Sequence, residues 1–230
     1  MTNKPKVSIV IPAYNEEEHI AAALQSALKQ NYSDFEIIVV NNNSHDNTAN
    51  IIATFPVKVI NEINKGTHFA RERGRKEAQG EYLAYMDADC LPDPDWLQKG
   101  LECFSNKSVV AASGPYAYYD DSGFFLSISL FFQKYIYTLV NFILQTFKIG
   151  GTMIGGNSFF RSSALQAIGG FDTKITFYGD DTDTAKRISR QGKIVFSPKV
   201  IMRTSARRFK AEGKLNIMFK YWYYFFKHLF

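Results

Sequence analysis

Two cysteines, Cys90 and Cys103, are too few for a disulfide framework and do not have the spacing of a zinc site. The 230-residue chain also lacks a dense block of basic residues, although its net charge is +5, so no nucleic-acid partner is expected. The first six residues lead directly into an apolar segment and do not have the pattern of a signal peptide. These absences together predict a protein of the reducing cytosol.

Apolar segments rich in β-branched residues alternate with segments that have apolar residues at helical spacing. The predicted strands are Val7–Pro12, Phe35–Val40, Val57–Ile60 and Tyr82–Met86, and the predicted helices are Glu16–Gln30, Ser44–Thr54, Gly66–Gln79 and Asp95–Phe104. Short strands that alternate with helices indicate βαβ units. The pattern therefore predicts an α/β fold with a parallel sheet.

Polar clusters follow three of the predicted strands, at residues 13–16, 41–44 and 87–89. In open α/β sheets, ligands bind beyond the carboxyl ends of the strands. The three clusters are therefore expected to converge on one ligand site.

Asp87 and Asp89 stand one residue apart at the end of a buried strand. Carboxylate oxygens suit hard cations such as Mg²⁺ and Mn²⁺, and Mg²⁺ often completes its coordination with substrate phosphates. Triplets of this kind also serve as plain turn or cap residues, so the neighbouring motifs must decide. If the two aspartates are functional, they are expected to bind a metal ion that bridges them to a phosphate ligand.

The second half of the chain contains long aromatic segments. Residues 122–149 are strongly apolar but include Gln133 and Lys134, which argues against a membrane span. They are expected to form amphipathic helices on a membrane or on the domain, or else a buried helical pair. We expect one domain over residues 1–205 with this insertion, and an amphipathic aromatic and basic helix over residues 206–230 of the interfacial type.

A series of short motifs resembles the inverting family 2 glycosyltransferases with the GT-A fold. The matching segments, in order, are residues 7–16, 36–48, 64–66 with 70–71, 80–89, 169–172 and 179–183. The resemblance extends over most of residues 5–200. It implies a Rossmann-like, mostly parallel sheet flanked by helices, a nucleotide-sugar donor, and Mg²⁺ or Mn²⁺ as cofactor.

The resemblance also implies donor-binding roles for particular residues. The first nucleotide-binding loop, where an aromatic ring packs on the base, is matched by Pro12, Ala13, Tyr14 and Glu16. Asn42 replaces the aspartate usual at a base-binding position, and because asparagine both donates and accepts, the base preference stays open. Arg71 matches a residue near the donor diphosphate. The alternatives are an ordinary loop aromatic for Tyr14, a helix-capping turn for Asn42 and a solvated helix face for Arg71.

The remaining matches concern the metal, the base and the acceptor. The metal and donor triplet is matched by Asp87, Ala88 and Asp89, with Asp89 as the metal ligand and Asp87 as donor contact and second ligand. Asp181 matches the catalytic base, preceded by Asp180 on the acceptor side. Gly156 and Asn157 match the loop that shapes the acceptor side. The aspartates could instead cap a helix, and the glycine loop could be purely structural.

The sequence therefore predicts a metal-dependent inverting glycosyltransferase of cell-envelope polysaccharide synthesis. Its expected partners are a UDP- or GDP-sugar and a lipid-linked or glycan acceptor such as a polyprenyl phosphate. The expected location is cytoplasmic and peripheral, at the inner face of the cell membrane. Arg203, Arg207 and Arg208 are candidates for contacts with phosphate or with lipid headgroups.

Two other functions are compatible with the sequence. A nucleotidyltransferase of nucleotide-sugar synthesis usually has a glycine-rich loop near its first strand, which residues 12–16 do not form. A non-catalytic nucleotide-binding scaffold would fit the run Asn41–Asn43, in which Asn42 stands where the family usually has aspartate. The presence of Asp87, Asp89 and Asp181 argues against this alternative.

Overall fold

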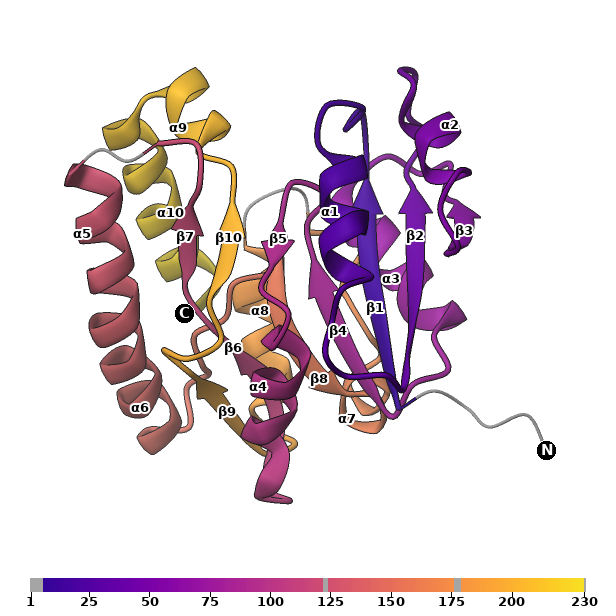
Figure 1. The fold of residues 1–230 in the computed structure, drawn as a ribbon. Coiled ribbons are helices and arrows are strands. Elements are labelled where there is room, and N and C mark those ends of the chain that lie inside the picture. Colours follow the sequence, from indigo (N-terminus) through magenta and orange to yellow (C-terminus); the bar gives the residue numbers. More distant parts are fainter. Residues whose placement is uncertain (1–5, 122–123, 176–178, 230) are drawn as a thin grey trace.

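The computed structural model in Figure 1 describes residues 6–121, 124–175 and 179–229. Within them, seven strands form a central sheet in the order β3-β2-β1-β4-β8-β6-β9. The strands are β1 (Val7–Ala13), β2 (Phe35–Asn41), β3 (Lys58–Asn61), β4 (Tyr82–Met86), β6 (Val109–Ser113), β8 (Asn157–Arg161) and β9 (Lys193–Phe196). All of them are parallel except β8, which is antiparallel to its neighbours β4 and β6. The predicted, mostly parallel sheet is confirmed.

Helices cover both faces of this sheet, as expected when parallel strands are joined by crossovers. They are α1 (Ile20–Ala27), α2 (Thr48–Ile52), α3 (Thr67–Glu77), α4 (Trp96–Glu102), the 3₁₀ turn η1 (Cys103–Ser105), α7 (Ser162–Ala167) and α8 (Asp180–Ile188). One cluster of buried apolar side chains joins β1 to α1 and α4, and a second joins β1 to α3 and α8 across the other face. Strand β1 is therefore buried along its whole length.

The first helix begins later than its apolar spacing predicted. It starts at Ile20 and not at Glu16, because Asn15 adopts a positive φ of 52° and turns the chain after β1. The N–H of Asn15 donates to Ser44 Oγ at 3.1 Å, and that of Glu16 donates to Thr48 Oγ1 at 2.7 Å. Glu16 consequently lies in a loop at the sheet edge, where its carboxylate is available to the site.

The carboxyl ends of the parallel strands meet at one edge of the sheet, as predicted. Ala13 is paired with Asn41, and the N–H of Asn42 donates to Ala13 O at 2.8 Å. Because β8 is antiparallel, its first residue, Asn157, is paired with Met86 at the end of β4. The glycine loop that precedes β8 is thereby brought to the same edge as Asp87 and Asp89.

A second, smaller sheet adds later segments to this edge. Its order is β5-β10-β7, with bounds Leu91–Pro92, Met202–Thr204 and Tyr116–Tyr118. Strand β10 is antiparallel to β5 and parallel to β7. The small sheet places Tyr116 and Thr204 beside the Asp87–Asp89 turn.

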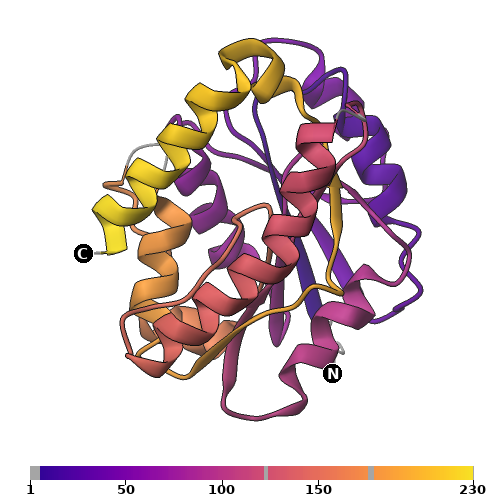
Figure 2. The ribbon, with the colours of Figure 1, turned by 90° about the vertical axis from the view of Figure 1, so that its left-hand side faces the viewer.

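The remaining helices lie on the side of the molecule that faces the viewer in Figure 2. They are α5 (Phe124–Phe132), the π-helical turn η2 (Gln133–Tyr137), α6 (Thr138–Thr146), α9 (Arg207–Glu212) and α10 (Lys214–Leu229). Helices therefore occupy both segments in which amphipathic helices were expected. Among the described residues, no helix combines the length and the apolar character needed to cross a bilayer.

Candidate active site

The Asp87–Asp89 turn leaves β4 with its two carboxylates close to the thiol of Cys90. One potential ligand atom from each of these three residues lies within 4.8 Å of the others. Cys90 is fully buried, and burial raises the pKa of its thiol well above the ordinary value, so sulfur is a poor ligand here. The oxygen atoms of Asp87 and Asp89 fit a hard divalent cation such as Mg²⁺ or Mn²⁺.

Asp89 lies in a largely enclosed position with a defined partner for each oxygen. Thr204 Oγ1 donates to Asp89 Oδ1 at 3.3 Å, and Arg207 Nη2 lies 3.2 Å from Asp89 Oδ2. Burial, reinforced by the charge of Asp87, raises the pKa of Asp89 to about 6, although Arg207 opposes the shift. A carboxylate in such surroundings gains stability when a cation binds to it.

Arg71 is a buried residue of α3 that joins two carboxylates. Its side chain is 7% exposed, with Nη1 2.6 Å from Asp180 Oδ2 and Nη2 3.1 Å from Asp87 Oδ1. These ion pairs, opposed by burial, raise the pKa of Arg71 above its ordinary value, so the guanidinium stays charged. Arg71 therefore lies inside the site, and the alternative of a solvated helix face is wrong.

Asp181 lies half-buried in the first turn of α8, next to Asp180. Burial and the neighbouring Asp180 raise the pKa of Asp181 to about 6, while Arg71 and the N–H groups of Thr182 and Gly155 oppose the shift. Gly179, in a left-handed conformation, occupies the N-cap position of α8, and Asp181 Oδ1 accepts the N–H of Thr182 in the first turn at 2.8 Å. One oxygen of Asp181 is thus used within the first turn of α8, and its role as the base stays a prediction.

Tyr14 follows β1, the neighbour of β4 in the sheet, and its side chain is half-buried between two loops. Lys65 Nζ lies 4.5 Å from the centre of its ring, and the ring of His45 meets it edge-on with centroids 6.5 Å apart. Asn42 is buried, and its Nδ2 donates to Glu62 O and Asn64 O. Its Oδ1 accepts the N–H of Gly66 at 2.8 Å. Asn42 therefore fixes the loop that carries Lys65, and it does not cap α2.

Three of the expected contact residues have side chains in the core. Pro12 is buried, Ala13 is 1% exposed and Ala88 is 3% exposed, so these residues can offer a ligand only backbone atoms. Their buried side chains belong to the core next to Tyr14 and the two aspartates.

Two residues at the end of the glycine loop before β8 were expected in the site. Gly156 faces the site, and Asn157 does not. A side chain at Gly156 would overlap Asp87 Oδ2 and Tyr116 Oη, so the backbone here lies directly against the Asp87 carboxylate. Asn157 is 0% exposed. Its Oδ1 accepts Trp96 Nε1 at 2.9 Å, and its Nδ2 donates to Val200 O at 2.8 Å. The expectation that Asn157 contacts the substrate is therefore corrected, because its polar atoms are used to hold the loop.

Several residues of the site were not assigned to it from the sequence. The hydroxyl of Tyr116 donates to Asp87 Oδ2 at 3.2 Å, and Thr204 binds Asp89 as described. Arg207, noted only as a possible phosphate or lipid contact, bridges Glu16 and Asp89. The only sequence signal for Tyr116 is its place after a buried strand and Gly114-Pro115, and Thr204 is the last residue of β10 in the small sheet.

The assembled site holds an excess of negative charge. Five carboxylates converge on the edge, from Glu16, Asp87, Asp89, Asp180 and Asp181, and the arginines bonded to them are Arg71 and Arg207. Such a surplus attracts a divalent cation and, through it, a phosphate ligand. Arg71 lies between Asp87 and Asp180, the residue next to Asp181.

The sequence pattern of glycosyl transferase family 2 matches residues 8–169 of the chain. Glycosyltransferase AglE of Haloferax volcanii is 28% identical over 215 residues, which cover 89% of this chain and 68% of AglE. A UDP-Glc:alpha-D-GlcNAc-diphosphoundecaprenol beta-1,3-glucosyltransferase of Escherichia coli, WfgD, is 37% identical over 100 residues, which cover 42% of this chain and 38% of WfgD.

Solved structures show the same fold. The mannosyltransferase PcManGT of Pyrobaculum calidifontis, in complex with GDP-Man and Mn²⁺, superimposes with a TM-score of 0.68 at 24% identity, over 94% of this chain and 63% of PcManGT. Residues 1–349 of TarS from S. aureus, in complex with UDP, give a TM-score of 0.70 at 18% identity, over 87% of this chain and 60% of that fragment. This chain spans less than two thirds of either solved chain, and the GT-A fold is confirmed. The chain belongs to glycosyltransferase family 2.

Proposed function

We propose that the protein transfers a sugar from a nucleotide-sugar donor to an acceptor hydroxyl or phosphate with inversion at the anomeric carbon, in a metal-dependent reaction. The observation that carries the proposal is the position of Arg71, which binds Asp87 on the donor side and Asp180 beside Asp181 on the acceptor side. A donor at the Asp87–Asp89 turn and an acceptor at Asp181 would therefore meet in one site.

In this mechanism Asp181 acts as the general base. Its carboxylate takes the proton of the acceptor oxygen, which attacks the anomeric carbon as the bond to the nucleoside diphosphate breaks. A base whose pKa is raised to about 6 is largely ionised at neutral pH and still accepts a proton readily. Asp180 is held by Arg71, so the repulsion between the two neighbouring aspartates is reduced.

Asp89 and Asp87 would hold the cation, Mg²⁺ or Mn²⁺. When bound, it neutralises the charge that develops on the leaving diphosphate. The residues of this chain provide the remainder of the donor site. Arg71 offers positive charge beside Asp87, and Gly156 allows the backbone to approach this carboxylate closely.

The donor base would lie against Tyr14. A base with carbonyl oxygens could also accept hydrogen bonds from Lys65, whose ammonium lies over that ring. The solved neighbours bind GDP-Man, UDP or UDP-GlcNAc, which supports a UDP- or GDP-sugar. Uracil and guanine both have such carbonyl oxygens, so the test below includes both.

The acceptor is proposed to be a lipid-linked glycan or polyprenyl phosphate. The name of WfgD gives a diphosphoundecaprenol acceptor for that enzyme. In this chain, exposed apolar side chains follow the outer surface of α5, η2, α6 and α10; the most exposed are Phe131, Tyr135, Phe142, Phe147, Leu215, Phe219 and Tyr223. We refer to these seven residues as the aromatic face.

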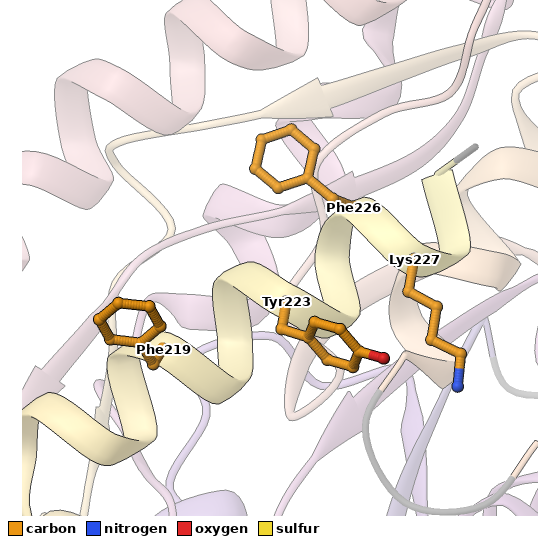
Figure 3. Close-up of a pocket in the computed structure, with 4 residues that line it drawn as sticks. All are labelled: Phe219, Tyr223, Phe226 and Lys227. Carbon is orange, nitrogen blue, oxygen red and sulfur yellow. The ribbon is translucent and has the colours of Figure 1, made fainter.

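A groove on α10 continues the aromatic face. Figure 3 shows that it is lined by Phe219, Tyr223, Phe226 and Lys227. Lys148 at the end of α6 and Lys227 on α10 are both exposed. Aromatic side chains beside lysines favour the interface of an anionic membrane. This combination supports a peripheral position at the inner face of the cell membrane, close to a lipid-linked acceptor.

A thermal-shift series tests the donor and the metal together. The melting temperature would be measured with UDP-, GDP-, CDP- and dTDP-sugars, with and without Mn²⁺, because a ligand stabilises the state that it binds. We expect a Mn²⁺-dependent rise with a UDP- or GDP-sugar. The rise should be lost in Asp89→Asn and kept in Asp93→Asn, whose exposed carboxylate pairs with Arg203. If no donor raises the melting temperature, the proposal fails in favour of a scaffold.

A further inference from the structure

Arg207 links α9 to the metal-site carboxylates across a long stretch of sequence. Its Nη2 atom donates to Glu16 Oε1, 191 positions earlier in the chain, and lies 3.2 Å from Asp89 Oδ2. The start of α9 is held separately by Asp120, which accepts Ser205 Oγ at 2.7 Å and the N–H of Ala206 at 2.6 Å. The contacts of the Arg207 side chain are therefore not needed to anchor the helix.

The two acidic partners need a positive charge. The carboxylates of Glu16 and Asp89 are each 13% exposed, and Glu16 Oε2 is buried without a hydrogen-bond partner, with His19 Nδ1 3.6 Å away. An ionised carboxylate with so little solvent is unfavourable unless a cation compensates it. The guanidinium of Arg207, which is 44% exposed, supplies that compensation from the solvent side.

The same oxygen atom would be required by a divalent cation. Asp89 Oδ1 accepts the hydroxyl of Thr204, which leaves Oδ2 as the freer ligand, and Oδ2 is the atom that Arg207 contacts. Two cations cannot share this position without strong repulsion. On the basis of the proposed metal-dependent function, we propose that Arg207 is a placeholder cation that competes with the metal for Asp89 and Glu16.

Arg207 then has a second role once it is displaced. Its guanidinium is half-exposed on a helix that Asp120 anchors, so the side chain can turn towards a diphosphate bound at the metal. A guanidinium binds phosphate oxygens through two parallel hydrogen bonds. Arg207 thereby gives up its carboxylate partners and gains phosphate partners. The metal and the diphosphate each bind more tightly when the other is present, which is a reciprocal coupling between the two ligands.

The experiment measures Mn²⁺ binding directly, by electron paramagnetic resonance titration of the full chain, with and without pyrophosphate as the diphosphate probe. The variants are Arg207→Ala, the conservative Arg207→Lys, and Arg203→Ala as control, since Arg203 is 46% exposed and pairs with Asp93 outside the site. Arg207→Ala should bind Mn²⁺ alone roughly fivefold more tightly, the effect of losing one partly exposed ion pair. It should bind Mn²⁺ with pyrophosphate roughly fivefold more weakly, because the loss of a two-bond phosphate contact worth about 25-fold outweighs the roughly fivefold gain from not having to displace Arg207.

The opposite signs of the two effects separate this inference from a purely structural role. Arg207→Lys should shift Mn²⁺ binding back towards wild type, and Arg203→Ala should equal wild type in both titrations. If Arg207→Ala binds Mn²⁺ alone no more tightly than wild type, the placeholder role is wrong even if the proposed function holds. If wild type binds no Mn²⁺ even with pyrophosphate, the metal dependence of the proposed function fails as well.

Discussion

Arg71 Nη1 lies 2.6 Å from Asp180 Oδ2, although the two residues are 109 positions apart in the chain. The second nitrogen of the same guanidinium binds Asp87. One buried cation therefore fixes the distance between the turn that would hold the donor and the helix that carries the proposed base.

Replacement of Arg71 should damage both stability and turnover. Arg71→Met would leave Asp87 and Asp180 without their shared partner, and the loss of one member of a buried ion pair costs about 3 kcal/mol of the free energy of unfolding. Turnover should fall by roughly 100-fold, because small displacements of reacting groups have effects of that size. Urea denaturation and a donor-turnover assay would measure the two effects.

The matched control for this variant is Arg73→Met on the same helix. Arg73 is 44% exposed and pairs with Glu77, so its loss should change stability by at most about 0.5 kcal/mol. A double variant, Arg71→Met with Asp180→Asn, should recover part of the lost stability. Equal effects of Arg71→Met and Arg73→Met would show that the buried ion pairs do not organise the site.

Asp181→Asn should abolish proton transfer and leave donor binding intact. The amide cannot accept the acceptor proton, so turnover should fall by about 100- to 10,000-fold, the usual contribution of a general base. Calorimetric titration with donor and Mn²⁺ should give the wild-type affinity. Asp183→Asn is the control, because the Asp183 carboxylate binds Arg187 within the helix at 2.6 Å. Turnover close to wild type in Asp181→Asn would refute the assignment.

The stability of the same variant should depend on pH in a defined direction. Burial raises the pKa of Asp181 to about 6 in the folded protein, whereas the unfolded chain has the ordinary, lower value. The folded state therefore binds this proton more tightly, and ionisation destabilises it as the pH rises towards about 6 and beyond. Asp181→Asn avoids this cost, so it should melt above wild type at about pH 7.5, with a smaller difference near pH 4. A difference that grows on acidification would contradict the shift.

The strand ends could be predicted from the sequence because apolar runs and turn residues are local signals. The start of α1 could not, since the bonds from Asn15 and Glu16 to Ser44 and Thr48 form only when two loops meet. The contact of Arg207 with Glu16 depends on how the small sheet places α9. Motif order could bring Asp87 and Asp181 into one site, but only tertiary packing reveals that Arg71 joins Asp87 to Asp180 and that Asn157 faces inward.

Gly156 should tolerate no side chain. A methyl group there would overlap Asp87 Oδ2 and Tyr116 Oη, so Gly156→Ala must displace the carboxylate or the loop. Overpacking of this kind typically costs about 1–3 kcal/mol, and turnover should fall as Asp87 moves. Gly150→Ala in the same loop is the control, because its nearest neighbour, Leu229 Cδ1, would lie at an ordinary 3.4 Å. Comparable melting temperatures and turnover for the two variants would contradict the close approach.

The aromatic face should bind anionic vesicles. Phe142 and Phe219 are 68% and 81% exposed on α6 and α10, and transfer of one phenylalanine side chain out of water contributes about 1.5–3 kcal/mol. The double variant Phe142→Ser with Phe219→Ser should therefore lower the vesicle partition coefficient by roughly 100-fold or more. Added salt should weaken wild-type binding only in part, because Lys148 and Lys227 contribute the electrostatic share.

Ile63→Ser is the control for vesicle binding, since Ile63 is 81% exposed in the loop between β3 and α3, away from the aromatic face. Two measurements show whether a membrane or a second copy of the chain covers the aromatic face. They are co-sedimentation with vesicles of phosphatidylglycerol and phosphatidylcholine, and sedimentation velocity of the lipid-free protein. A monomer that sediments with vesicles supports the membrane, because the apolar side chains are then free to enter lipid. A dimer that the double variant dissociates, with no vesicle binding by wild type, would show instead that a second copy covers the face.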